Sequence, residues 1–246
     1  MNNLLVNGDF ISYPQYVWQD NATVRLPGCW DLFDYERGGD DTKMPECYVM
    51  DMREPQNIGP IWKVFTTFAK HEYALGQRVI VPVGSQLVFR AGVWAWSSGK
   101  DNPLLSETGG SYHTRIGIDP FGGTDWRSPY VVWDYPPLGH KLMDIPDEHY
   151  LEATAEAGMI TVWLHGQHEW ALKHGDAYWH EASLEITSQP TPEPSGDLAA
   201  LTARVAELER QLRETGTAHT DAIAQLEAQV AQIEIFLAQW TQYTWQ

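Results

Sequence analysis

The sequence is poor in several features that mark large classes of protein. Only two cysteines occur among 246 residues, Cys29 and Cys47, which leaves room for one bond but for no disulfide framework. No apolar run approaches about 18 residues, so we expect no membrane-spanning segment. Basic residues are scarce, and the net charge of −17 makes nucleic acid and anionic membranes unfavourable partners.

The chain also lacks common motifs of catalysis and export. Neither Gly-x-Ser-x-Gly nor His-Glu-x-x-His occurs, and the first residues show no basic segment or cleavage site typical of a secretory signal. We therefore expect a virion component or an extracellular protein released without a signal, with a cytoplasmic protein as the alternative. Should the protein cleave glycans, Asp119 with Asp125, or Asp144 with Glu148, would supply the carboxylate pair.

What the sequence does contain divides it into two parts joined by a linker. The aromatic, turn-rich region 1–187 predicts a β domain, and the 12 Trp and 11 Tyr of the chain are far above ordinary usage. The Pro-rich segment 188–197 is typical of an extended spacer. A heptad pattern fills 198–246. A head on a stalk is typical of a displayed, multivalent binder, because a stalk adds valency without adding chemistry.

Apolar residues of the stalk recur at spacings of three and four, which predicts a coiled coil. They are Leu198, Leu201, Val205, Leu208, Leu212, Ile223, Leu226, Val230, Ile233, Leu237 and Trp240. Between the halves, a stutter at Thr215 and His219, beside Gly216, indicates either local unwinding or a helical hairpin, and we favour the continuous coil. Phe236 and Tyr243 widen the apolar stripe, which favours a homotrimer.

β-rich runs closed by turn residues fill the region 1–187. The clearest predicted strands are Gln77–Val83, Gln86–Trp96, His113–Ile118, Tyr130–Trp133, Met159–His165 and Tyr178–Ile186. Strands of this number and length predict an all-β, antiparallel sandwich. The one candidate for a helix in this region is Asp147–Ala157.

Three segments carry a resemblance to a known family. Asn3–Phe10 (Asn-Leu-Leu-Val-Asn-Gly-Asp-Phe) resembles the opening strand of the jelly-roll carbohydrate-binding modules of the galactose-binding-like superfamily. Val81–Trp96 is similar to a central strand pair of these modules, and Ala177–Ile186 is similar to their closing strand. The resemblance covers 1–187 and implies a jelly-roll sandwich, with a glycan as the ligand class.

Such modules often hold a structural Ca²⁺ between the opening and closing strands, using a carboxylate after the Gly-Phe and one of a closing Asp pair. In this sequence Ile11 follows Phe10, and the pair is His180-Glu181. The resemblance therefore implies Asp9 and Glu181 as carboxylate ligands of Ca²⁺, together with backbone carbonyls.

Strand alternation separates core side chains from those on the opposite faces. Trp94, Trp96, Arg115, Trp163 and His165 fall at non-core positions of three predicted strands. If those strands are neighbours, the five form one face of aromatic planes and hydrogen-bond donors, which suits a sugar. The alternatives are that loops within 27–62 or 97–112 cover them as a second small core, or that the face binds a protein.

The loop Ile118–Trp126 places Asp119 and Asp125 around Pro and Gly-Gly, followed by Trp126. These Asp residues would accept sugar hydroxyls or a cation, or would close turns through their own backbone, which we favour.

The sequence thus predicts a non-catalytic binder of a glycan or another surface ligand, displayed on a trimeric coiled coil in a phage fibre or a capsid or tail appendage. A purely structural virion protein that binds other virion proteins is one alternative, and a glycan-cleaving enzyme is the other.

Overall fold

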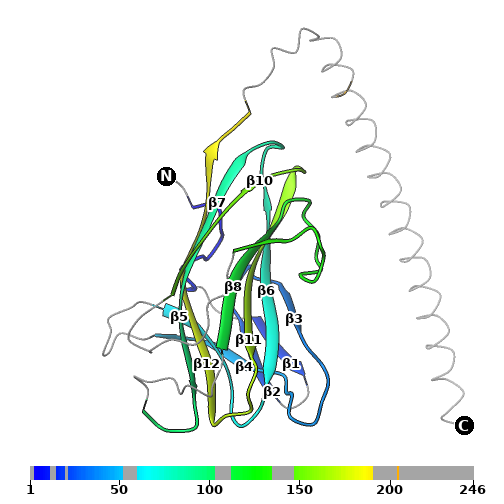
Figure 1. Cartoon of the computed structure of the whole chain (residues 1–246). Helices are drawn as coiled ribbons and strands as arrows, with labels where there is room; N and C mark the ends of the chain where they lie inside the picture. Colours follow the sequence, from blue (N-terminus) through cyan, green and yellow to red (C-terminus); the bar gives the residue numbers. More distant parts are fainter. Residues whose placement is uncertain are drawn as a thin grey trace, which may run out of the picture. The chain divides into compact units, whose positions relative to one another are not determined.

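A computed structural model of the chain describes residues 3–11, 15–19, 22–51, 60–102, 112–134, 147–190 and 204 (Figure 1). The chain divides into two units, Met1–Pro190 and Thr191–Gln246, and the division falls inside the Pro-rich segment. The predicted coiled coil 198–246 lies outside the described residues, apart from residue 204. The homotrimer therefore stays a prediction.

The first unit is a sandwich of two β-sheets, as Figure 1 shows nearly edge-on. The larger sheet has seven strands in the order β1 (Gln15–Gln19), β2 (Ala22–Leu26), β4 (Glu46–Asp51), β5 (Pro60–Thr66), β12 (His174–Ser188), β7 (Gln86–Ser98) and β10 (Asp147–Thr154). The smaller has five, in the order β3 (Leu32–Tyr35), β6 (His71–Ile80), β11 (Met159–His168), β8 (Tyr112–Asp119) and β9 (Val132–Trp133). All neighbouring strands are antiparallel except β2 and β4.

The prediction of an all-β sandwich is confirmed, and the predicted helix is wrong. Asp147–Ala157 contains strand β10, which pairs with β7 along its whole length, so that Leu151 faces the core while Tyr150 and Glu152 are exposed. Hydrogen bonding to β7, whose edge would otherwise be unpaired, outweighs the weak helical pattern of this segment. Among the described residues, no helix is long and apolar enough to cross a membrane. Cys29 is exposed and Cys47 is buried, and neither is in a disulfide.

The core between the sheets contains large aromatic side chains whose polar atoms are paired. The indole Nε1 of Trp179 on β12 donates to the Tyr73 hydroxyl on β6 at 2.7 Å, which joins the two sheets. Tyr112 is hydrogen-bonded to Tyr73 and also to Nε2 of His71, at 2.7 Å in the second case. The His71 Nδ1 contacts the Thr66 hydroxyl at 2.8 Å. These buried polar atoms thus satisfy one another in one connected series that runs between the two sheets.

The opening segment that resembles carbohydrate-binding modules lies against the closing strand, but it is not a strand. The Asn3 side chain accepts a hydrogen bond from the Leu184 N–H at 3.0 Å and donates to the Ala182 carbonyl at 2.9 Å. The Ala182 N–H donates in turn to the Gly8 carbonyl. A Cβ at Gly8 would lie 2.2 Å from the Ala182 oxygen, so this close approach requires glycine.

We expect Tyr73→Phe to destabilise the domain by about 1–3 kcal/mol, because the buried Trp179 Nε1 would lose its acceptor. Urea unfolding, followed by intrinsic fluorescence, measures the loss. Tyr130→Phe is the matched control, since Tyr130 is 64% exposed and its change should stay within about 0.5 kcal/mol. Equal stability of Tyr73→Phe and wild type would contradict this assignment.

We also expect stability to fall as the pH drops through about 6.5. Burial lowers the pKa of His71 well below its ordinary value of 6.5, and burial lowers the pKa of His168 as well. Below pH 6.5 the unfolded chain therefore binds protons that the folded chain does not, so protonation favours unfolding. Urea midpoints should be lower at about pH 5 than at about pH 7.5. A midpoint that stays constant or rises on acidification would contradict the burial of neutral histidines.

Candidate functional site

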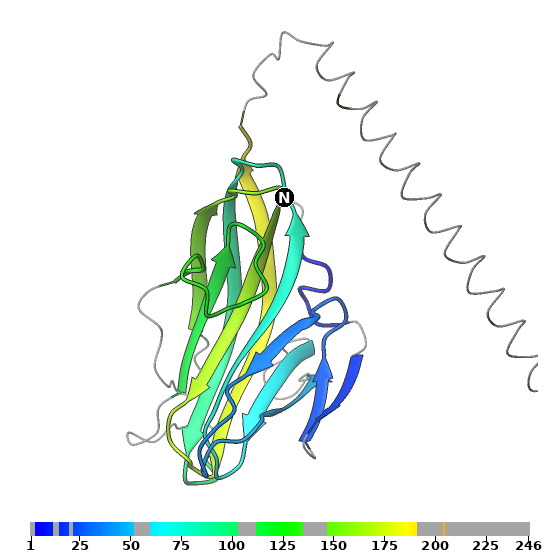
Figure 2. The ribbon, with the colours of Figure 1, turned by 90° about the vertical axis from the view of Figure 1, so that its right-hand side faces the viewer.

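The outer face of the five-stranded sheet brings together three side chains predicted for a ligand face. Arg115 on β8 pairs with His165 on β11, and Trp163 on β11 pairs with Gly117 on β8. Side chains at the intervening positions of both strands belong to the core, so these three point the other way. Figure 2 looks onto this sheet.

The prediction that Trp94 and Trp96 share that face is wrong, because they lie on the other sheet. Both are on β7, whose neighbours are β12 and β10, whereas Arg115 lies on β8. Trp94 and Trp96 are 5% and 8% exposed and pack with Ile61 and Tyr178. This matches the alternative of a second small core.

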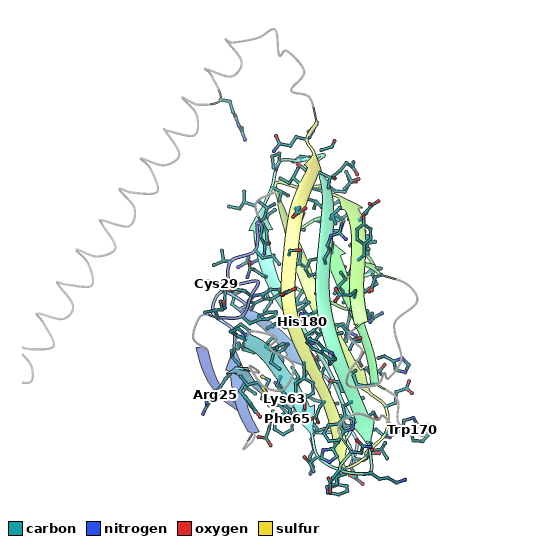
Figure 3. All side chains as sticks on the ribbon, turned by 90° about the vertical axis from the view of Figure 1, so that its left-hand side faces the viewer. Arg25, Cys29, Lys63, Phe65, Trp170 and His180 are labelled. Carbon is teal, nitrogen blue, oxygen red and sulfur yellow. The ribbon has the colours of Figure 1, made fainter. Side chains whose placement is uncertain are left out.

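Lys63, Asp176 and Tyr178 form a connected polar group beside this second core. The Lys63 ammonium lies 2.9 Å from an Asp176 carboxylate oxygen, which also accepts a hydrogen bond from the Tyr178 hydroxyl at 2.8 Å. Figure 3 looks onto the seven-stranded sheet and shows Lys63, Phe65 and His180 on it. The Lys63 ammonium also lies 4.4 Å from the Phe65 ring centroid. The Lys63–Asp176 ion pair has its partners within the protein, so we assign it a structural role on this face of the sheet.

Two glycines allow two indole rings to lie flat on the five-stranded sheet. A Cβ at Gly76 would lie 2.7 Å from ring atoms of Trp163, and a Cβ at Gly117 would lie 2.7 Å from ring atoms of Trp133. Trp163 is fully buried, whereas Trp133 is partly exposed. Trp133 is therefore supported from below by the backbone and keeps part of its surface exposed.

A hydrogen-bonded chain of three side chains lies next to Trp133. The Arg115 Nε–H donates to Nδ1 of His165 at 3.2 Å, so Nδ1 is the unprotonated nitrogen of that ring. The other nitrogen, Nε2, therefore carries the hydrogen and donates to the Glu72 carboxylate at 2.8 Å. The Arg115 guanidinium also lies 4.1 Å from the Trp133 ring centroid. Arg115 is thereby held in one orientation.

The electrostatics of this chain keep His165 neutral. Burial lowers the pKa of His165, and the charge of Arg115 adds to this effect, against the opposing carboxylate of Glu72. The His165 hydrogen bond helps to bring the pKa of Glu72 below its ordinary value, in spite of burial. The site thus contains a fixed cation, a neutral imidazole and a fixed anion in sequence.

A pocket of about 260 Å³ lies beside the hydrogen-bonded side chains of Arg115 and His165. Its described lining consists of His113, Arg115, His165, Gln167 and Glu169. His113 Nε2 contacts the Glu169 carboxylate at 3.3 Å. The pocket therefore offers several hydrogen-bond donors and acceptors within a small volume, which suits a ligand rich in hydroxyl groups.

Asp119 and Asp125 act as turn residues, as favoured from the sequence. The Asp119 carboxylate accepts a hydrogen bond from the Phe121 N–H at 2.8 Å, and that of Asp125 accepts one from the Arg127 N–H at 2.9 Å. Asp119 is also 2% exposed. Neither carboxylate is part of the described lining of the pocket.

Trp126, from the same loop, covers part of the sheet. It is 4% exposed, packs with Trp163, and lies 4.9 Å from the His165 ring. Its Nε1 donates to the Asp34 carboxylate at 3.0 Å, and that carboxylate also pairs with Arg127. Trp126 is therefore a support of the site and is not presented as a stacking surface.

Both carboxylates of the predicted calcium pair belong to exposed residues. Asp9 is exposed, and its carboxylate faces the Ile11 N–H at 3.4 Å. Glu181 is exposed at a bulge of β12, with a φ of 51°. Within the part of the chain that the structure describes, no group of three or more His, Cys, Asp or Glu residues could hold a metal ion. The calcium site stays a prediction.

Sequence reasoning missed Glu72, Gln167 and Glu169, and it did not single out Trp133. The predicted strand began at Gln77, although β6 begins six residues earlier. The alternation of His71, Tyr73 and Leu75 with small or acidic residues was the available signal for the earlier start, and hence for Glu72.

Several solved structures are similar to this chain. TmCBM61, in complex with beta-1,4-galactotriose, has 11% identity and a TM-score of 0.45, over 76% of this chain and 99% of that one. The CBM22-1 xylan-binding domain of Paenibacillus barcinonensis Xyn10C has 8% identity and a TM-score of 0.38, over 64% and 87%. The enzymatically active domain of tailspike protein 4 from bacteriophage CBA120 has 12% identity and a TM-score of 0.37, over 75% and 21%.

Two of these three structures are carbohydrate-binding modules by their descriptions. The likeness is weak, and the two-sheet architecture given above rests on the strand pairing. No protein-family model and no curated protein matches the sequence.

We expect Gly117→Ala to lift Trp133 off the sheet and to destabilise the domain by about 1–3 kcal/mol, because the added methyl overlaps the indole. Urea unfolding and the tryptophan emission maximum measure both effects. Gly158→Ala is the control, since a Cβ there meets nothing within 4 Å. An unchanged emission spectrum and midpoint for Gly117→Ala would contradict the flat packing of Trp133.

Proposed function

We propose that the β-sandwich binds a glycan in the pocket beside Arg115 and His165, without cleaving it. The ligand class follows from the chemistry of the site. Sugar rings carry a rim of hydroxyls, so they fit a small pocket lined by hydrogen-bond donors and acceptors that are held in place. The weakly similar carbohydrate-binding modules agree with this class.

The observation that carries the proposal is the orientation of Arg115. Its guanidinium is fixed by Trp133 on one side and by the His165–Glu72 pair on another. A guanidinium has five donors, and its fork suits two adjacent hydroxyls. Because the side chain is already held, little further conformational entropy is lost on binding.

The described residues around the pocket favour binding over cleavage. Glycoside hydrolysis uses two carboxyl groups that flank the bond, and Glu169 is the one carboxylate among the described lining residues. The carboxylates of Asp119 and Asp125 accept hydrogen bonds from backbone N–H groups of their own turns. Asp144 lies outside the described residues.

An Asp–His–Thr series near the pocket supports a structural role and not catalysis. The Asp134 carboxylate contacts Nδ1 of His149, whose Nε2 lies 3.1 Å from the Thr114 hydroxyl. Thr114 is fully buried, so no substrate reaches the hydroxyl. The series joins β8 to β10, which lie in different sheets.

Multivalent display is a further part of the proposal and is supported by the heptad pattern of 198–246. A homotrimer would present three pockets, so that weak single-site binding becomes strong attachment to a repeating surface. A phage fibre or a capsid or tail appendage is the setting that we propose for such a head and stalk. Binding of Ca²⁺ by Asp9 and Glu181 belongs to the same proposal.

The direct test is a binding screen of the full chain against immobilised β-1,4-linked galactose and xylose oligosaccharides, the ligands named for two similar structures. We expect binding, and we expect Arg115→Ala to weaken it by about tenfold or more, through loss of a charged hydrogen-bond donor. Arg90→Ala is the matched control. Arg90 lies on the other sheet, where it stacks on Tyr150, so binding should not change.

Failure of the folded full chain to bind any oligosaccharide of a broader panel would reject the glycan proposal. Turnover of a bound glycan would reject the non-catalytic part alone. Full retention of affinity by Arg115→Ala would place the binding site elsewhere.

A further inference from the structure

The loop that joins β11 to β12, from one sheet to the other, displays a tryptophan next in sequence to a residue of the pocket. Glu169 lines the pocket, and Trp170 is the next residue, with its Cα about 3.8 Å further along the chain. Trp170 is 55% exposed, whereas Trp163 and Trp126 are buried. Figure 3 shows Trp170 projecting from the end of the sandwich, clear of the strands.

The β11–β12 loop is held in place by contacts with neighbouring loops. The Phe68 N–H donates to the Leu172 carbonyl at 2.8 Å, which joins this loop to the β5–β6 turn. On the other side, Asp101 pairs with the Lys173 ammonium at 2.7 Å and with Nε2 of His174 at 2.9 Å. Trp170 is therefore presented on a supported turn and not on a loose tail.

The β5–β6 turn itself shows that this end of the domain is built to expose aromatic rings. Phe68 is 63% exposed and has a φ of 52°, a left-handed conformation that is unfavourable for a bulky side chain. Such conformations persist where the surroundings impose them, and they concentrate at binding sites. Two large rings in water on adjacent turns indicate an interaction surface.

We propose that Trp170 is a second sugar subsite, on which the unit next to the one in the pocket stacks. The proposal rests on the proposed function. The ligand is then an oligosaccharide of at least two units, with one ring held by Arg115 and Gln167 in the pocket and its neighbour on the indole. An aromatic plane next to a polar pocket is the arrangement expected for consecutive units of one chain.

The position of the subsite also fits access by a long glycan. β12 begins at this end with His174 and runs to Ser188 at the opposite end, roughly 45 Å away at about 3.3 Å per residue. Figure 1 shows that course. The backbone leaves the first unit at Pro190, so the exit of the chain lies at the other end from Trp170.

The test compares a monosaccharide with its β-1,4-linked disaccharide and trisaccharide, using galactose and xylose as probes, by titration calorimetry on the full chain. Trp170→Ala should weaken binding of the trisaccharide by about tenfold and leave the monosaccharide unchanged. Trp170→Phe should keep most of the affinity. Arg115→Ala should weaken binding of every probe.

Tyr130→Ala is the matched control, because Tyr130 is 64% exposed and lies in the loop that follows the other end of β8. It should leave every affinity unchanged. Equal affinity of Trp170→Ala and wild type for the trisaccharide would overturn the subsite while leaving the pocket assignment intact. The same loss for monosaccharide and trisaccharide would also overturn it. Absence of binding by the wild-type chain would overturn both proposals.

Discussion

The site depends on how the positive charge of Arg115 is stabilised on the outer face of the five-stranded sheet. Arg115 is partly removed from water, and a charge in that position is stable only with partners. His165 accepts its Nε–H, Glu72 accepts from His165, and Trp133 lies against the guanidinium. The order of these contacts sets the tautomer of His165 and the charge of each group. Everything that we propose for recognition follows from a guanidinium that is already oriented before a ligand arrives.

The two faces of the sandwich use aromatic residues for different ends. On the seven-stranded sheet, Trp94 and Trp96 pack into a small core. On the five-stranded sheet, Gly76 and Gly117 leave space for Trp163 and Trp133 against the backbone, and Trp133 stays partly exposed beside Arg115.

Much of the fold could be predicted, because alternation and turn residues are local signals. The strands around Gln86–Trp96 and Met159–His165 were found with small errors at their ends. The shared face of Trp94 and Arg115 was wrong, because the assignment of a strand to a sheet depends on long-range pairing that no local pattern encodes. Glu72 was missed for a related reason: its role arises only where β6, β11 and β8 lie side by side.

A crystal structure of the full chain with a bound β-1,4-linked oligosaccharide tests the central claim most directly. The account predicts one sugar ring in the pocket, with its hydroxyls within hydrogen-bond distance of Arg115. A sugar bound on the seven-stranded sheet, or at any place that leaves Arg115 untouched, would contradict it.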